Sequence, residues 1–271
     1  MSIRSFWPLK RMRESEQLLK RPTPMRYLVS TLCLVLTASA APAEDALPHH
    51  TILRAAGPIA VDGRLDEPSW EAVQVIDQFV FPWWTEGAKD RTEARLLWDD
   101  VYLYVAFTAY DPHISATLTE RDSPVSRDDC VEVFIAPDTS QVTNYFNFEF
   151  NALGTILDRS PHADRSSAWN GEGVQVAIDI QGTLNQETDQ DTLWIAEIAL
   201  PFAVFDPYVP NLPPTAGDAW RLNLYRTGGA VNLQYITWSN TLTPKPQFHV
   251  PERFGVVHFD SRPVLSQDDE E

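Results

Sequence analysis

The sequence has few cysteines, few methionines and few basic residues. Two cysteines, Cys33 and Cys130, are too few for a disulfide-stapled scaffold or a cysteine-rich zinc site. The 21 lysine and arginine residues face 38 aspartate and glutamate residues, which gives a net charge of −17. A surface this negative repels the phosphate backbone of nucleic acids and anionic lipid headgroups. We therefore expect no nucleic-acid partner.

Long apolar runs and internal repeats are also missing. After residue 43 no apolar run approaches the roughly 20 residues that a membrane-spanning helix needs, and no long segment recurs at a fixed period. The 271 residues are 44% hydrophobic and 22% charged, so the chain can bury a sizeable core. This predicts one large domain or two small ones, without a solenoid or a second membrane span.

The N-terminal segment has the order of a secretory signal peptide. Met25-Arg26 precedes an apolar stretch from Tyr27 to Leu36, and small residues continue to Ala43. We predict cleavage after Ala43 and a secreted or periplasmic protein, because the apolar stretch is too short for an uncleaved anchor. The basic residues before Met25 are either an extended n-region of the signal peptide or the product of a wrongly chosen upstream start codon. Met1 and Met25 are therefore both candidates for the first residue.

Cleavage would change the composition of the chain. Residues 1–43 hold seven basic and two acidic residues, all three methionines and Cys33. The mature protein would then carry a net charge of −22, no methionine and Cys130 as its only thiol. It would have no internal disulfide.

Strand patterns dominate the remaining sequence. The runs 92–98 and 101–110 are joined by Asp99-Asp100, the spacing of a tight hairpin. In the run 145–151 three phenylalanines alternate with polar residues, as in a strand with one buried face. Many short strands with few helices predict an all-β fold, specifically an antiparallel two-sheet β-sandwich. Further strand signals cover residues 129–136, 174–180, 193–200, 220–227 and 255–259.

These patterns suggest a domain organisation along the chain. One short helical turn is expected from Pro201 to Phe205, because proline is favoured at the first helical position. The expected segments are a signal peptide with its extension (1–43), an N-terminal linker (44–57), the β-sandwich (58–260) and an acidic C-terminal tail (261–271).

Tryptophan is abundant, and aromatic rings are the usual platform on which the apolar face of a sugar stacks. Eight tryptophans remain after residue 43. Those within strand runs, Trp98, Trp194 and Trp220, are expected in the core. Trp83 and Trp84 follow a proline in a loop-like stretch, so they are candidates for an exposed platform.

Polar residues within strands mark a candidate binding face. Glu132 interrupts an apolar strand, and a carboxylate there must face solvent, pair with a cation or contact a ligand. If their strands are neighbours, several other residues would share one polar surface with it; these are Asn147, Glu149, Arg221, Asn223 and Tyr225.

Support for catalysis or a metal site is weaker. No nucleophile elbow, phosphate loop or H-E-x-x-H motif occurs, and an acidic chain offers glycosidase-like carboxylate pairs by chance. Asp62, Asp66 and Glu67 are candidates for a calcium site, with a simple polar turn as the alternative.

Seven segments in order, spanning residues 58–259, resemble the family 9 carbohydrate-binding modules in their stand-alone secreted bacterial form. The resemblance implies a non-catalytic β-sandwich that grips the end of a glucan or xylan chain between two aromatic rings. Structural calcium is a further implication of it. The segments are V-D-G-R-L-D-E-P-S-W, L-W-D-D-V-Y-L-Y-V-A-F, D-D-C-V-E-V-F-I-A-P-D, F-E-F-N-A-L-G-T-I-L-D, W-I-A-E-I-A-L-P-F, G-D-A-W-R-L-N-L-Y-R and F-H-V-P-E-R-F-G.

The resemblance also assigns site positions. The strand glutamate of the family corresponds to Glu132, and one aromatic wall, usually tryptophan, corresponds to Phe248. The second wall falls at Ser126 and the basic residue of the family at Glu149, so the chain departs from the family pattern at both. Trp83, Trp84 or Tyr225 would have to supply a substitute platform. The implied ligand-binding set is Glu132, Phe248, Tyr225, Glu149, Asn147 and Trp84.

We therefore predict a secreted, non-catalytic saccharide-binding protein of carbohydrate catabolism. One alternative is a glycoside hydrolase or an accessory part of one, and another is an interaction domain whose sugar site has decayed. The fold also resembles extracellular haem-binding cytochrome domains, but the mature chain lacks the methionine that usually ligates the iron there.

Overall fold

The computed structural model describes residues 46–161, 169–206, 208–209 and 211–264. The chain divides into two units, Met1–Ala41 and Pro42–Glu271, and the description concerns the second. The predicted signal segment and residues 265–271 of the predicted acidic tail lie outside the described residues. Among the described residues, no helix has the length and apolar character needed to cross a membrane.

The described part of the chain is built almost entirely from strands, which confirms the all-β prediction. One short helix, α1 (Pro68–Ala72), and single 3-10 turns such as η1 (Val125–Arg127), η3 (Phe202–Phe205) and η4 (Pro251–Arg253) interrupt them. The strands are β1 (His49–Arg54), β2 (Thr92–Trp98), β3 (Tyr102–Tyr110), β4 (Cys130–Ala136), β5 (Phe146–Asn151), β6 (Ile156–Arg159), β7 (Gln175–Gln181), β8 (Leu193–Pro201), β9 (Ala219–Thr227), β10 (Tyr235–Thr237) and β11 (Gly255–Pro263).

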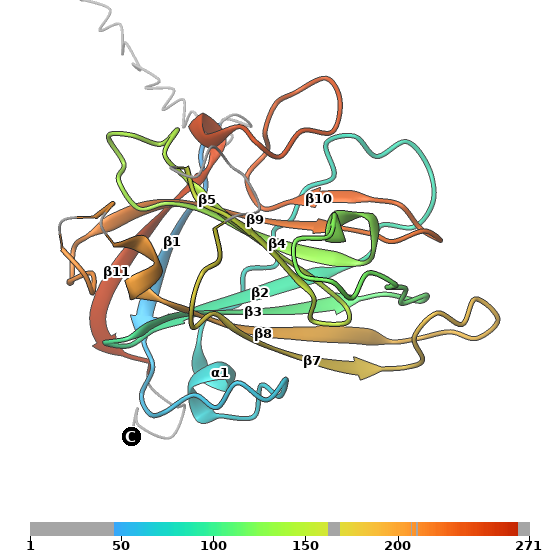
Figure 1. The fold of residues 1–271 in the computed structure, drawn as a ribbon, viewed down its shortest axis with the longest axis horizontal. Helices are drawn as coiled ribbons and strands as arrows, with labels where there is room; N and C mark the ends of the chain where they lie inside the picture. The colour runs from blue at the N-terminus through green and yellow to red at the C-terminus, as the bar shows by residue number, and fades with distance from the viewer. Residues whose placement is uncertain (1–45, 162–168, 207, 210, 265–271) are drawn as a thin grey trace, which may run out of the picture. The chain divides into compact units, whose positions relative to one another are not determined.

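The strands form one continuous sheet in the order β6-β5-β4-β9-β11-β1-β2-β3-β8-β7, with β10 paired to β9. Figure 1 shows β5, β4 and β9 above β2, β3, β8 and β7, so the sheet folds over on itself. We expected two separate antiparallel sheets. Instead, β1 pairs in parallel with both β11 and β2 and joins the two halves, whereas the other pairings are antiparallel.

The joining strand lies in a segment that the sequence predicted as a linker. Residues 44–57 contain β1, whose Ile52 is fully buried and whose His50 is 7% exposed. The prediction was wrong because β1 has no clean apolar alternation, and its pairing is set by tertiary contacts with β2 and β11. Likewise, residues 261–263 of the predicted tail continue β11.

The two halves share one hydrophobic core. The alternating side chains Phe146, Phe148 and Phe150 point into it from β5 and are completely buried. The predicted core tryptophans Trp98, Trp194 and Trp220 are at most 2% exposed, which confirms their interpretation. Removing this much aromatic and aliphatic surface from water is the main force that closes the sheet.

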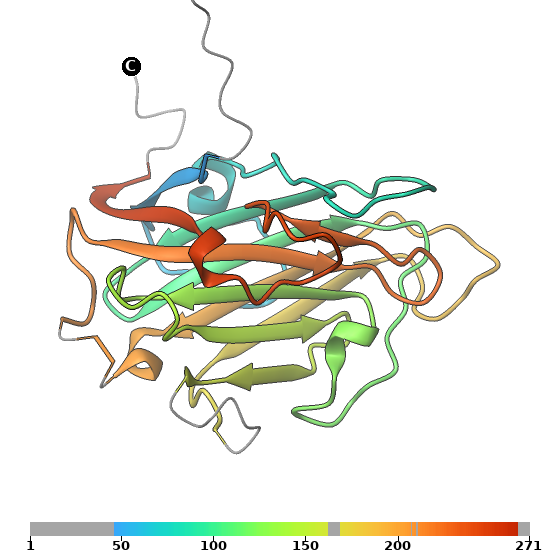
Figure 2. The same cartoon turned by 90° about the horizontal axis from the view of Figure 1, so that it is seen from above.

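The opposite face of β5, β4 and β9 is covered by loops rather than by another sheet. A second apolar cluster lies there, formed by Phe134, Ala136, Tyr145, Tyr225 and Phe254, with Phe248 packed at its edge. Figure 2 shows the chain that follows β10, in orange-red, running over β9 and β4. Polar residues on this face are therefore partly enclosed.

Candidate functional site

The polar residues of three neighbouring strands meet on the outer face. β4 lies between β5 and β9, and its Glu132 is paired with Glu149 of β5 and with Tyr225 of β9. In antiparallel sheets, directly paired residues point to the same side. The strands are thus neighbours, as the shared polar surface predicted from the sequence required.

A pocket of about 320 Å³ opens over this surface. Glu132 and Glu149 form its floor and are only 2% and 7% exposed. The half-buried Phe248 stands beside them. The pocket is lined by Ser126, Arg127, Glu132, Glu149, Thr227, Tyr235, Pro246, Gln247, Phe248 and His249.

Phe248 is held in place by Tyr225. Their rings stack with centroids 4.2 Å apart and an angle of 16° between the planes. The Tyr225 hydroxyl also donates a hydrogen bond of 2.7 Å to the Phe248 backbone oxygen. Because Tyr225 is completely buried, it supports the aromatic wall instead of forming one, which differs from the predicted platform role.

Asn147 has a similar supporting position. It is completely buried, and its Nδ2 donates a hydrogen bond of 3.0 Å to Glu149 Oε1. Asn147 does not belong to the lining of the pocket. This hydrogen bond helps to fix the Glu149 carboxyl group, which lines the pocket.

The pocket floor has unusual electrostatics. Burial raises the pKa of Glu132 well above the ordinary glutamate value, and the nearby charge of Glu149 raises this pKa further. The hydrogen bond from Thr227 Oγ1, 3.4 Å from Glu132 Oε1, lowers the pKa of Glu132 by less than the other two effects raise it. Glu132 therefore keeps its proton to higher pH than an exposed glutamate. A protonated carboxyl group both donates and accepts hydrogen bonds, which suits a hydroxyl-rich ligand.

Several pocket residues were missed by the sequence reasoning. Tyr235 lies on β10, a strand of three residues that shows no periodic signal. His249 lies in the loop before η4, and its Nδ1 is 2.8 Å from the Tyr145 hydroxyl. Ser126, which the family resemblance had named as the position of the second wall, was not missed; it lies in η1 and lines the pocket with a small side chain.

The remaining predicted residues lie outside this pocket. Arg221 donates hydrogen bonds to the backbone oxygens of Phe254 and Glu252. Asn223 binds both backbone groups of Ser239. These side chains fix the loops on the outer face. Trp84, which is 43% exposed, lines a neighbouring pocket.

The proposed calcium candidates form a hydrogen-bonded turn. Asp62 Oδ1 accepts a bond from the Arg64 backbone, Asp66 pairs with the Arg64 side chain, and Glu67 Oε1 accepts from the Ala60 backbone. No group of three or more histidine, cysteine, aspartate or glutamate side chains suited to a metal ion occurs among the described residues. The calcium prediction stays a prediction.

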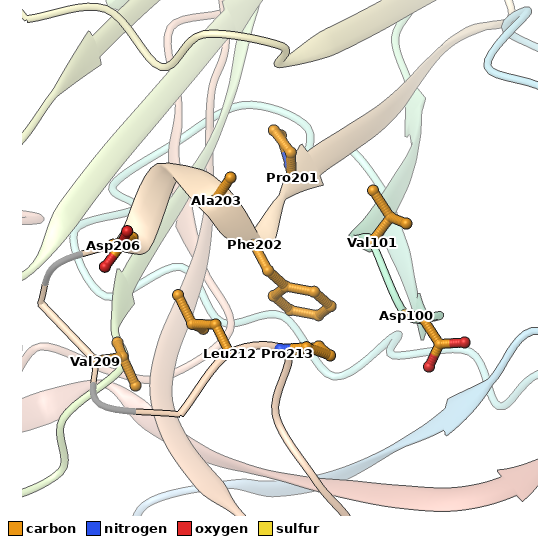
Figure 3. Close-up of a pocket in the computed structure, with 9 residues that line it drawn as sticks. All are labelled: Asp100, Val101, Pro201, Phe202, Ala203, Asp206, Val209, Leu212 and Pro213. Carbon is orange, nitrogen blue, oxygen red and sulfur yellow. The ribbon is translucent and has the colours of Figure 1, made fainter.

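A larger cavity of about 420 Å³ lies where β8 ends. Figure 3 shows Phe202, Leu212 and Pro213 on one side of it and Val101 and Asp100 on the other. The Asp100 carboxylate pairs with Arg54 at 2.8 Å. This lining is mainly apolar and presents few polar groups to a hydroxyl-rich ligand, so we assign the candidate site to the pocket over Glu132.

Comparisons with known proteins identify the family and the fold of the chain. The sequence model of carbohydrate-binding family 9 matches residues 60–259. A candidate carbohydrate-binding protein from Bacteroides uniformis is 18% identical, with a TM-score of 0.67, over 79% of this chain and 100% of that chain. No curated protein matches.

A family 9 carbohydrate-binding module from Caldicellulosiruptor kristjanssonii also has this fold. Its structure with cellotriose is 14% identical, with a TM-score of 0.56, over 79% of this chain and 95% of that chain. Its structure with glucose is 14% identical, with a TM-score of 0.54, over 80% and 99%. At these identities the likeness concerns the fold.

Proposed function

This chain belongs to carbohydrate-binding family 9, and we propose that it is a secreted protein that binds a glucan-type or xylan-type saccharide without catalysing a reaction. The observation that carries the proposal is the pocket that combines Glu132 and Glu149 with the aromatic wall Phe248. The complexes of the Caldicellulosiruptor kristjanssonii module with cellotriose and glucose support a ligand of this class.

The pocket supplies both kinds of contact that a sugar needs. Tyr225 covers one face of the Phe248 ring, so the apolar face of a sugar can stack only on the other face. The carboxyl groups of Glu132 and Glu149 line the same pocket and can bind the hydroxyl groups of that sugar. Because Glu132 keeps its proton to higher pH than an exposed glutamate, its carboxyl group can donate as well as accept hydrogen bonds to these hydroxyl groups.

Calorimetric titration of the purified protein tests the proposal. The ligands are glucose and the cello- and xylo-oligosaccharides, with and without calcium. We expect saturable binding that Glu132→Ala abolishes, while Glu172→Ala, a change at an exposed glutamate, leaves the affinity unchanged. A well-folded protein that binds none of these ligands would contradict the proposal.

A second candidate function rests on the same two glutamates. A glycoside hydrolase also uses two carboxyl groups in one pocket, one of them with a raised pKa, as Glu132 has here. Chromatography of cello- and xylo-oligosaccharides after prolonged incubation with the protein distinguishes the two functions. We expect unchanged oligosaccharides, whereas turnover that is lost in Glu132→Gln would establish an enzyme.

The departures from the family pattern support a third candidate, an interaction domain with a decayed sugar site. Ser126 and Glu149 replace an aromatic and a basic residue of the family pattern. Absence of binding to all saccharides would favour this function. Export, the remaining part of the proposal, is tested by N-terminal sequencing of the protein recovered outside the cytoplasm, with residue 44 as the expected first residue.

A further inference from the structure

A second pocket, rich in aromatic residues, lies beside the first. It has a volume of about 220 Å³ and is lined mainly by the segment that precedes β2 and the segment that leads into β10. Its aromatic and apolar lining includes Phe81, Trp83, Trp84, Leu233 and Tyr235. The side chains of Trp84 and Leu233 are 43% and 60% exposed, so both present apolar surface to solvent at this pocket.

The two pockets are adjacent, because Tyr235 and Pro246 line both of them. The Tyr235 ring lies 6.2 Å from Phe248 in the first pocket and 6.4 Å from Trp83 in the second, in edge-to-face contact with each. A ligand that extends from the first pocket past Tyr235 therefore enters the second.

Different contacts hold the two tryptophan side chains of the second pocket in place. Trp83 is fixed, because its Nε1 donates a hydrogen bond of 2.7 Å to the Thr243 backbone oxygen. Trp84 is held by Lys89, whose Nζ lies 4.5 Å from the centroid of the indole ring. Lys89 thus covers one face of the Trp84 ring, so that only the opposite face can stack on a ligand, and the exposed Glu86 adds a carboxylate to the lining.

We propose that this aromatic pocket is a second sugar subsite, so that the ligand is an oligosaccharide chain bound along both pockets. The inference rests on the proposed function of the first pocket. A platform of aromatic rings with polar groups at its edge matches a sugar unit, which has an apolar face and hydroxyl groups around it. The first pocket then binds one end of the chain, and Trp84 binds a unit farther along.

Affinity as a function of chain length tests the second subsite. The full protein is titrated with cello- and xylo-oligosaccharides of two to six units. We expect the affinity to rise with chain length by about threefold to tenfold and then to reach a plateau, because one additional stacking contact supplies an increase of this size. An affinity that does not change with chain length would overturn the subsite while leaving the proposed function intact.

Variants separate the two pockets. Trp84→Ala is expected to abolish the rise with chain length and to leave the affinity for the shortest ligand unchanged, whereas Trp84→Tyr retains most of the rise. Glu132→Ala should remove binding of every ligand. If Trp84→Ala weakens short and long ligands equally, Trp84 belongs to the first site and a separate subsite does not exist. If no oligosaccharide binds the unmodified protein, the subsite and the proposed function both fail.

Discussion

Glu132 and Glu149 occupy directly paired positions in the antiparallel ladder of β4 and β5, and both are buried at the floor of one pocket. Like charges on directly opposite residues of a sheet destabilise it. The burial of Glu132 and the charge of Glu149 together raise the pKa of Glu132. This pair therefore lowers the stability of the folded protein. A destabilising pair of buried carboxyl groups in a pocket is typical of a functional site.

Replacing Glu132 by glutamine should stabilise the protein at neutral pH. Below the ordinary glutamate pKa of 4.5, the side chain is protonated in both the folded and the unfolded chain. Above that value the unfolded chain ionises first, so the free energy of unfolding falls as the pH rises toward the folded pKa. A glutamine side chain is uncharged at every pH, so in Glu132→Gln the free energy of unfolding does not fall in this way. We expect a higher melting temperature than wild type at pH 7.5 and a similar one at pH 4.

The exposed Glu187 provides a matched control for this measurement. Glu187→Gln should change the melting temperature little at either pH, because an exposed carboxylate is solvated in both states. If Glu132→Gln melted like the wild type at pH 7.5, the carboxyl group would not be costly in the folded protein, and the description of the pocket floor would be wrong.

Restoring the second aromatic wall should tighten saccharide binding. The family resemblance places that wall at Ser126, which lines the pocket with a small side chain and would leave one side of a bound sugar without a stacking partner. We expect Ser126→Trp to increase the affinity by about tenfold, the equivalent of ~1.4 kcal/mol. Titration of the variant against the tightest ligand of the wild type measures the change. Weaker binding by Ser126→Trp would show that this side of the pocket must stay open.

The buried carboxylate of Glu197 should contribute to stability and not to binding. Its Oε2 accepts hydrogen bonds of 2.9 Å from the backbone of Asp62 and Gly63, and its Oε1 accepts one of 2.9 Å from Trp70 Nε1. An amide cannot accept at both positions, so Glu197→Gln leaves a buried donor without a partner. We expect a loss of about 1–3 kcal/mol in urea unfolding. Unchanged stability relative to Glu172→Gln would contradict this role.

The Arg226 guanidinium should be among the most sensitive positions of the fold. It is completely buried, pairs with Asp111 at 2.7 Å and donates to the backbone oxygen of Tyr110 at 2.9 Å. Arg226→Met leaves the buried Asp111 without its cation, which we expect to cost about 3–5 kcal/mol in chemical unfolding. Arg64→Met, at an exposed pair with Asp66, should cost about 1 kcal/mol or less. Equal losses in the two variants would mean that burial of the charge is unimportant.

Strand positions were predictable from the sequence to within one or two residues where alternation was strong. The run 92–98 matches β2 in full, and the run 145–151 differs from β5 by one residue. The short strands β6 and β10 were missed, because three or four residues carry no measurable period. Pro201 directly precedes the single helical turn η3, which was predicted, and Pro251 begins the turn η4, which was not.

The candidate site was accessible from the sequence only in part. Glu132 stood out as a carboxylate within an apolar strand, and Phe248 came from the family resemblance. The pairing of Glu132 with Glu149 depends on the sheet order, which a single sequence does not contain. Tyr235 lines two pockets because loops from distant segments converge on β10, and nothing local in the sequence indicates this convergence.

The parallel pairing of β1 with β11 has a consequence for the order of events during synthesis. His49 of β1 and His258 of β11 stack on each other although 209 positions separate them in the chain. β1 thus completes its pairing only once β11 is available, and its pairing with β2 covers only two residues in the meantime. Closure of the sheet therefore requires β11. Such long-range pairing is slow compared with the local hairpin of β2 and β3.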